Sequence, residues 1–314
     1  MTPALIALAL GAFAALHAAS WGGFKDAPFE GFRWRSYARS LLLGAAVAGL
    51  VALWLPVTSP RSAVTLIGVT YALERLATEW WKSIVREDDQ SAYTIPMRLG
   101  IRGRTIDDRR TRYLAGSVVA LLVALSLLVM HLLQAVAPTA PTWLVVLTVG
   151  GAGGWATAVG GAWKDAPVEG FSGWKFLRSP LVATAWALPL SIVTHSWPAL
   201  LLGAAGFAVA SIETYKTFFT GGRAPGKFAG RPVRSTLPRL RRALATQNAA
   251  WWLVMSAAFA ASILNPLSPL GALPVPTGPV TATLLSVAAG AVGLAGMVTV
   301  RGHSKRLLAL DVTL

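Results

Sequence analysis

Two copies of one octapeptide place pairs of carboxylates at a spacing suited to metal or phosphate chemistry. Residues 25–32 read Lys-Asp-Ala-Pro-Phe-Glu-Gly-Phe, and residues 164–171 repeat them with Val in place of the first Phe, at an offset of 139. In each copy the Asp and the Glu are four residues apart, so a helical turn would bring both to one side. The four carboxylates are those of Asp26, Glu30, Asp165 and Glu169.

We expect these carboxylates to hold one or two Mg²⁺ ions, and through them a phosphate or diphosphate. Mg²⁺ is commonly bound by a few carboxylates together with substrate oxygens. Basic residues at matching places in both copies would complete the anion site as charge-assisted donors. They are Lys25, Lys164, Arg39 and Arg178. The structural alternative stays open: Asp caps a turn, Pro fixes its φ and Gly ends it.

A second pair of acids, Glu74 and Glu213, lies inside apolar segments, again 139 residues apart. A carboxylate at such depth costs on the order of 2.5 to 3.5 kcal/mol, so a cation, a proton or water must compensate for it. Lys25 and Lys164 are candidate partners. Arg75 adjoins Glu74 but points about 100° away around a helix, so it is not an automatic partner. We expect the two acids to act as a catalytic base, a substrate anchor or coupling acids of a transporter.

The composition is that of a membrane protein. Of the 314 residues, 54% are hydrophobic and 13% charged, and the mean hydropathy is +0.57, outside the usual soluble range. The net charge of +15 is better explained by membrane topology than by nucleic acid. We therefore expect membrane lipids as partners and no nucleic acid. The absence of cysteine excludes disulfides and thiolate sites.

Nine apolar segments, mostly of spanning length, predict an all-α polytopic membrane protein. They are residues 2–20, 37–56, 62–84, 113–137, 142–162, 177–194, 197–219, 248–267 and 279–300. The first has no basic region before it and has an internal counterpart at 142–160, so we interpret it as a retained helix and not as a signal peptide.

The distribution of basic residues predicts the topology. All Lys and Arg except Arg61 and Arg75 fall in or beside the loops after the first, third, fifth and seventh segments, or in the tail after the ninth. This agrees with the rule that cytoplasmic loops carry the positive charge. We expect a multi-pass protein of the cytoplasmic membrane, with its amino terminus outside and residues 301–314 inside.

The offset of 139 extends beyond the octapeptide and predicts a tandem duplication. Arg39-Ser40 matches Arg178-Ser179, and Gly22 matches Gly161. Four helices per copy is an even number, so the copies keep one orientation and are related by an axis along the membrane normal. The predicted units are a four-helix repeat over 1–139, a second over 140–278, and a ninth helix with a basic tail over 279–314.

Nine helices with two acidic motifs on one membrane face resemble the arrangement of the UbiA-type intramembrane prenyltransferases. The stretch Thr94-Ile95-Pro96-Met97-Arg98-Leu99-Gly100 also looks like the segment that follows the second acidic motif of that family. The Asn-Asp-x-x-Asp run of the family is missing, and the Thr-Ile-Pro segment falls in the first copy instead of the second. The resemblance implies Mg²⁺-dependent prenyl transfer as an analogy, and no residue role is carried over from it.

Two functions fit the sequence. One is a Mg²⁺-dependent, transferase-like enzyme acting at the cytoplasmic face on a lipid or isoprenoid that bears phosphate or diphosphate. The other is a transporter or channel whose substrate passes between the two repeats, with Glu74 and Glu213 as its binding acids. The concentration of charge at one face favours the enzyme, because a route for ions would need charge at the other face too.

Overall fold

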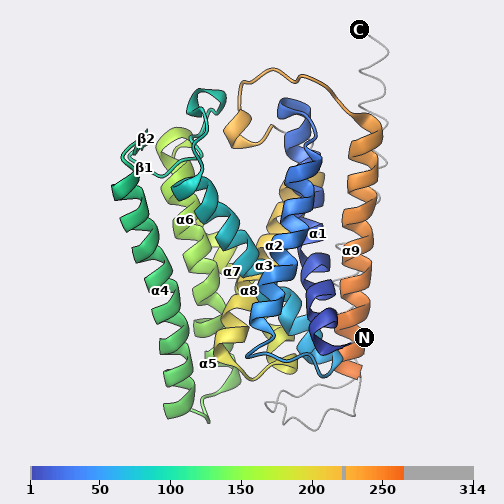
Figure 1. The fold of residues 1–314 in the computed structure, drawn as a ribbon. Helices are drawn as coiled ribbons and strands as arrows, with labels where there is room; N and C mark the ends of the chain where they lie inside the picture. The colour runs from blue at the N-terminus through green and yellow to red at the C-terminus, as the bar shows by residue number, and fades with distance from the viewer. Residues whose placement is uncertain (1, 221–223, 265–314) are drawn as a thin grey trace.

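The computed structural model, described here for residues 2–220 and 224–264, is an all-α bundle of eight long helices (Figure 1). The helices are α1 (Pro3–Glu30), α2 (Trp34–Val51), α3 (Pro60–Trp80), α4 (Arg109–Val136), α5 (Thr142–Val145) continuing through η3 (Val146–Gly150) into α6 (Gly151–Glu169), α7 (Gly173–Val193), α8 (Trp197–Thr214) and α9 (Pro238–Leu264). Short π-helical turns, η1 (Trp81–Val85) and η4 (Tyr215–Phe219), extend α3 and α8. The loops contain two 3₁₀ turns, η2 (Gln90–Ala92) and η5 (Gly226–Phe228), and the antiparallel pair β1 (Gly100–Ile101) and β2 (Arg104–Thr105).

Five of these helices are long and apolar enough to cross a membrane. They are Pro3–Glu30, Arg109–Val136, Thr142–Glu169, Gly173–Val193 and Trp197–Phe219. The chain is therefore a multi-pass membrane protein by the length and composition of its helices. The predicted segments that correspond to α2, α3 and α9 are helical but are not among the five. The predicted ninth segment, 279–300, lies outside the described residues.

The helices begin where the sequence supplies capping groups. The Ser59 side chain accepts a hydrogen bond from the backbone N–H of Ser62, and the Ser62 hydroxyl accepts one from the backbone N–H of Ser59, so α3 opens with a reciprocal capping box. Asp108 accepts from the Thr111 backbone at the start of α4, and Ser196 caps α8 in the same way. These caps satisfy amide groups that have no partner inside the helix.

The octapeptides form the last turns of two helices, although the predicted segments 2–20 and 142–162 end before them and leave them to the loops that follow. α1 runs to Glu30 through Pro28, and α6 runs to Glu169 through Pro167. Each proline lies in the last turn, where its missing N–H removes one hydrogen bond without breaking a longer helix. The glycines that follow, Gly31 at φ 78° and Gly170 at φ 84°, adopt a left-handed backbone and stop both helices. The Asp and Glu of each copy therefore do lie on one helical side.

Glycines allow the helices to approach each other closely. At the contact of α3 with α8, a Cβ on Gly206 would lie 2.1 Å from the backbone oxygen of Gly68. At the contact of α1 with α2, a Cβ on Gly11 would lie 2.3 Å from the oxygen of Gly44. A Cβ on Gly154 in α6 would lie 2.4 Å from Pro180 Cα in α7. Association in a bilayer depends on such close packing, because lipid tails are as apolar as the side chains.

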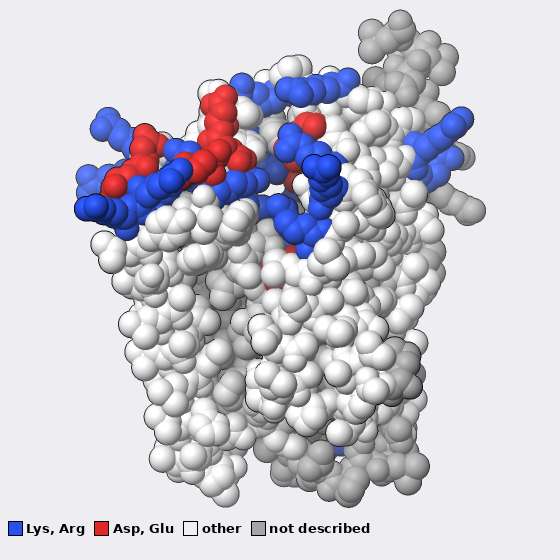
Figure 2. All heavy atoms as spheres, in the orientation of Figure 1, with Lys and Arg blue, Asp and Glu red and all other residues white. Residues whose placement is uncertain are grey.

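Charged side chains gather at one end of the bundle, as the sequence predicted. Figure 2 shows Lys, Arg, Asp and Glu concentrated at the upper end, over the ends of α1, α3 and α6, while the rest of this face is almost uncharged. Arg61 lies at the other end, where its Nε donates to the backbone oxygen of Ser262 at 2.9 Å. The compartment that each end faces stays a prediction.

Replacement of Gly206 by Ala should destabilise the bundle by about 1 to 3 kcal/mol, because the new methyl group would overlap the Gly68 backbone. The matched control is Gly160→Ala in α6, where nothing lies within 4 Å of an added Cβ. Thermal unfolding of the detergent-purified protein should show a lower midpoint for Gly206→Ala and an equal or higher one for the control. Equal midpoints for the two variants would contradict close packing of α3 on α8.

Candidate functional site

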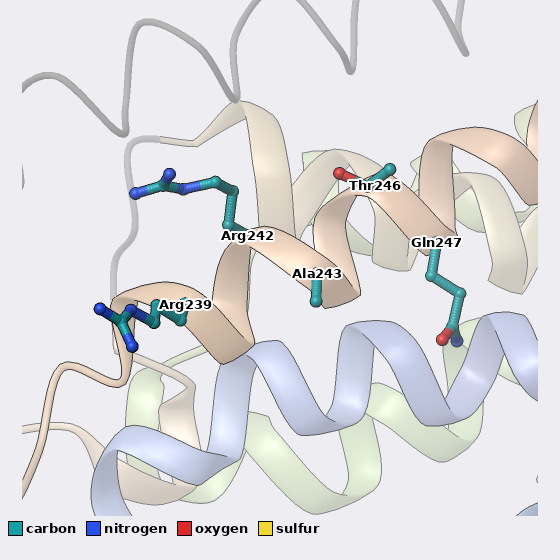
Figure 3. Close-up of a pocket in the computed structure, with 5 residues that line it drawn as sticks. All are labelled: Arg239, Arg242, Ala243, Thr246 and Gln247. Carbon is teal, nitrogen blue, oxygen red and sulfur yellow. The ribbon is translucent and has the colours of Figure 1, made fainter.

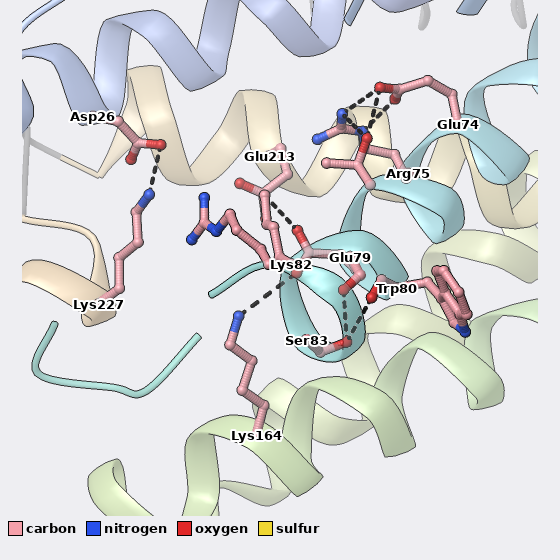
Figure 4. A network of polar contacts seen from close by, with 12 residues as sticks. Asp26, Glu74, Arg75, Glu79, Trp80, Lys82, Ser83, Lys164, Glu213 and Lys227 are labelled. Carbon is pink, nitrogen blue, oxygen red and sulfur yellow. Dashed lines mark hydrogen bonds and ion pairs between the residues drawn. The ribbon is translucent and has the colours of Figure 1, made fainter. Parts of the chain in front are cut away.

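Ten charged side chains meet at the charged end of the bundle, and we refer to them as the charged cluster; Figure 4 labels all of them except Lys25 and Lys216. They come from seven elements: Lys25 and Asp26 of α1, Glu74, Arg75 and Glu79 of α3, Lys82 of η1, Lys164 of α6, Glu213 of α8, Lys216 of η4 and Lys227 of η5. Six cations and four carboxylates leave a formal net charge of +2. The cluster is therefore suited to an anion.

The octapeptide lysines pair with acids on distant helices. Lys25 Nζ of α1 lies 2.7 Å from Glu213 Oε2 of α8, and both side chains are largely buried. Lys216 adds a second contact to Glu213 at 3.2 Å. Lys164 Nζ of α6 lies 3.6 Å from Glu79 Oε2 of α3. Lys25, one of the two candidate partners that the sequence offered for the buried acids, thus lies against Glu213. The Lys25–Glu213 and Lys164–Glu79 contacts each connect the end of one octapeptide helix to a helix of the other predicted repeat.

Glu74 has a different partner from the one we predicted. It is 1% exposed, and both of its oxygens accept from the Arg75 guanidinium, Nε and Nη2 each at 2.6 Å. The Thr78 hydroxyl donates a third bond at 3.0 Å. The Cα–Cβ bonds of two adjacent helical residues do point in different directions, but the long Arg75 side chain folds back around the helix to reach Glu74. The predicted partners, Lys25 and Lys164, bind other acids.

The octapeptide carboxylates do not converge on one point. Asp26 pairs with Lys227 at 2.8 Å, and Glu169 pairs with Lys175 at 2.7 Å. Asp165 makes no ion pair with another described residue, although Lys164 and Lys216 are close enough to influence it. Within residues 2–220 and 224–264 no group of three or more His, Cys, Asp or Glu side chains is placed to hold a metal ion. The Mg²⁺ site therefore stays a prediction.

The cations of the cluster are only partly those that the sequence indicated. Arg39 is exposed, and neither it nor Arg178 makes an ion pair in the described part of the chain. Lys82 and Lys227, which the sequence analysis did not single out, are members of the cluster instead. Lys82 follows Glu79 by three residues, and this helical spacing was a usable signal for their 2.8 Å pair. Lys227 carried no such signal. It is 201 positions away from Asp26 in the sequence, and only the folding of its loop brings the two side chains together.

Two loops fold over the cluster and fix Lys227. Thr94 donates its backbone N–H to the oxygen of Lys227 at 2.8 Å and its hydroxyl to Ala229 at 2.6 Å. The ring of Phe228 stacks on Phe29 of α1, with centroids 4.9 Å apart. Gly226 lies directly against α6, since a Cβ there would lie 2.3 Å from Glu169 Oε1. The loop therefore contacts both octapeptide helices.

A buried polar network lies next to the cluster in the bundle interior. His17 of α1 places Nδ1 3.0 Å from the Tyr71 hydroxyl of α3 and Nε2 2.9 Å from the Thr214 hydroxyl of α8. Trp21 donates to Tyr71, and Trp252 of α9 donates to Thr214. All of these buried polar groups find hydrogen-bond partners inside the protein, as buried polar groups generally do. Four helices are thus held in register just below the charged groups.

A second ion-pair group anchors the loop between η1 and α4. Glu87 accepts from Arg98 and Arg109 at 3.0 Å each, and also from Arg112. The Arg112 side chain is 1% exposed. Partial burial favours the protonated acid, but the three guanidinium groups outweigh it and hold the pKa of Glu87 below its usual value. Glu87 therefore positions the loop that carries Thr94.

Comparison with known proteins gives no match of any kind: no family model fits the chain, and no curated protein and no solved structure is similar to it. The resemblance to the UbiA-type prenyltransferases therefore remains an analogy of motifs. What the site does must follow from its residues.

The loop between residues 86 and 108 should open when Glu87 is protonated. Because the pKa of Glu87 is lowered in the folded state, its ion pairs stabilise the loop above the unfolded-state pKa of about 4.3 and are lost as the pH falls through the lower folded value. Limited proteolysis of this loop should accelerate at acid pH, and Glu87→Gln should accelerate it already at pH 7. Asp107→Asn, which removes only an exposed pair with Arg98, is the control. Equal cleavage of both variants would contradict the anchoring role of Glu87.

Proposed function

We propose that the chain is a membrane-embedded, transferase-like enzyme whose charged end binds the phosphate or diphosphate of a lipid or isoprenoid substrate. The observation that supports this proposal is the net-positive charged cluster, built from distant parts of the chain at the end of an otherwise apolar bundle. A substrate with an anionic head and an apolar tail would place its head at the charged end and its tail along the apolar part of the bundle. Cations in a partly desolvated site also stabilise charge that develops on phosphate oxygens more strongly than they would in water.

We assign the phosphate to the lysines of the cluster. Lys25, Lys164 and Lys227 each carry one carboxylate contact, so each ammonium group has further N–H donors for a substrate oxygen. Arg75 is already occupied by the bidentate contact with Glu74. We assign to Glu213, held between Lys25 and Lys216, the role of substrate anchor or base. Glu74 then serves mainly to keep Arg75 in place.

We also assign Mg²⁺ to Asp165 in preference to Asp26. Asp26 is engaged by Lys227, whereas Asp165 makes no ion pair with any residue that the structure describes. Mg²⁺ usually binds through one or two carboxylates together with substrate phosphates, so a complete protein cage is not required. Glu169, one turn further along α6, is the other carboxylate that such an ion would meet.

We further propose that the bundle is a tandem duplication with nine spans. Helices α1 and α6 end at Glu30 and Glu169, and α2 and α7 begin at Trp34 and Gly173, each pair 139 residues apart. The close contacts also correspond: Gly11 meets Ala48 in one copy and Gly150 meets Ala187 in the other, at the same offset. Contacts that repeat with the sequence offset support common descent of the copies. The distribution of basic residues supports a cytoplasmic location for the charged end.

A transporter with its path between the repeats is the second candidate. The observation that favours it is the polar network of His17, Tyr71 and Thr214, which continues from the charged cluster into the bundle interior. Buried polar groups near the bilayer midplane mark substrate paths in many transporters. Flux of a solute into liposomes, abolished by Glu213→Gln, would distinguish this function from the enzyme.

Native mass spectrometry of the detergent-purified protein should reveal a retained phosphate-bearing lipid. The variant Lys25→Gln/Lys164→Gln should lower its occupancy at least about tenfold, since each charge-assisted contact contributes roughly 1 to 3 kcal/mol. The matched control is Arg102→Gln/Arg104→Gln, which removes the same charge from the β1–β2 turn. Removal of Mg²⁺ by a chelator should reduce retention further if the metal bridges the phosphate. Equal losses in the two double variants would contradict the assignment to lysines.

The two octapeptide aspartates should respond differently to mutation. Asp26→Asn leaves the largely buried Lys227 unpaired and should lower the unfolding free energy by about 1 to 3 kcal/mol. Asp165→Asn should leave the unfolding midpoint unchanged and abolish the effect of Mg²⁺ on lipid retention. Thermal unfolding and mass spectrometry of both variants check this. An effect of Mg²⁺ that survives Asp165→Asn would rule out the metal assignment.

A further inference from the structure

A groove along α9 lies away from the residues assigned to the substrate. It has a volume of about 600 Å³ and is lined by Arg239, Arg242, Ala243, Thr246 and Gln247 (Figure 3). Figure 3 shows the guanidinium groups of Arg239 and Arg242 both extending toward the start of α9, while the Gln247 side chain points toward α1. Gln247 is held there by two hydrogen bonds, to the backbone oxygen of Leu16 and from the Tyr37 hydroxyl. The groove therefore has a fixed inner wall and a basic mouth.

The two arginines at the mouth carry charge that no described residue neutralises. Both are exposed, and neither makes an ion pair with a carboxylate of residues 2–220 or 224–264. The neighbouring Arg241 instead packs its guanidinium over the ring of Phe24 at 4.2 Å. Figure 2 shows basic side chains over the upper end of α9 with no acidic atoms beside them on this face. The mouth of the groove thus favours an anion.

The exposed face of α9 changes from charged to apolar along its length. Beyond Arg239 and Arg242 the same helical stripe continues through Thr246 and then through Ala250, Leu253 and Val254, all exposed. Steps of three and four residues keep these positions on one side of the helix. From Arg239 to Val254 the helix rises about 22 Å, which is close to the depth of one leaflet with its headgroups. The stripe therefore offers cations, then a hydroxyl, then an apolar surface.

We propose that this stripe is a binding site for one anionic phospholipid. The headgroup phosphate contacts Arg239 and Arg242, the Thr246 hydroxyl lies at the level of the glycerol backbone, and an acyl chain follows Ala250, Leu253 and Val254. Arginine suits this role because its planar guanidinium can hold two phosphate oxygens at once. The site is separate from the charged cluster, so it binds a lipid that is not the substrate.

The preference for an anionic lipid should depend on the two arginines. In native mass spectrometry of the full chain, wild type should bind phosphatidylglycerol in preference to phosphatidylcholine, and Arg239→Gln/Arg242→Gln should weaken phosphatidylglycerol binding by roughly 10- to 30-fold. The control Arg102→Gln/Arg104→Gln removes equal charge at the other side of the same end and should keep the preference. If the double variant does not fold, Arg242→Gln alone should give a loss of about fivefold.

Three outcomes would overturn the site. They are an unchanged preference in Arg239→Gln/Arg242→Gln, an equal loss in the control, and displacement of phosphatidylglycerol by excess inorganic phosphate, which would indicate a simple anion site without a lipid. Lys25→Gln/Lys164→Gln should retain phosphatidylglycerol, because its changes lie in the charged cluster. That result separates failure of the lipid site from failure of the proposed enzyme site.

Discussion

Neutralisation of carboxylates at the end of an apolar bundle is the constraint on which the rest of the structure depends. Glu74, Glu213 and Asp26 are removed from bulk water to different degrees, and an unpaired charge in such a place costs several kcal/mol. Each is matched by a cation, and two of the three cations come from remote parts of the chain: Lys25 reaches Glu213, and Lys227 reaches Asp26. The arrangement of the helix ends follows from these pairings.

The pairings also explain why the loops fold over the charged end. Lys227 can reach Asp26 only if η5 returns to α1, and the contacts of Thr94 and Phe228 hold it there. Glu87 in turn fixes the loop that carries Thr94 through three arginines. The loops therefore do more than connect spans. They supply Lys227 to the cluster and hold it against α1.

The sequence was informative wherever one residue type or one periodicity decides the structure. Apolar runs predicted the helices, because burial of apolar surface or contact with lipid requires them. The clustering of Lys and Arg predicted that the loops share one end. The octapeptide was left outside the helix because the apolar run ends near residue 20, whereas the helix continues through the charged residues and Pro28, which costs little in a last turn, to Glu30 before Gly31. The Glu74–Arg75 pair was missed because backbone direction does not limit a side chain as long as that of Arg.

Partners set by tertiary folding could not be predicted. Nothing near Lys227 in the sequence indicates Asp26, and nothing near Lys164 indicates Glu79, because both contacts depend on how α1, α3 and α6 pack. The glycine contacts that set this packing are visible in the sequence only as isolated small residues. What chemistry the cluster performs depends on the same geometry. The residues alone therefore suggested a carboxylate metal site, whereas the structure places lysines around a shared set of acids.

The most direct test of this account is a charge exchange between Lys25 and Glu213. Lys25→Glu and Glu213→Lys each place like charges about 3 Å apart in a largely buried site, so each should lower the unfolding midpoint and abolish retention of the phosphate-bearing lipid that binds at the charged cluster. The double variant Lys25→Glu/Glu213→Lys should recover most of the midpoint, because the pair is restored in reverse. If the double variant loses as much stability as the two single variants lose together, the ion pair does not hold the two helices together and the account is wrong.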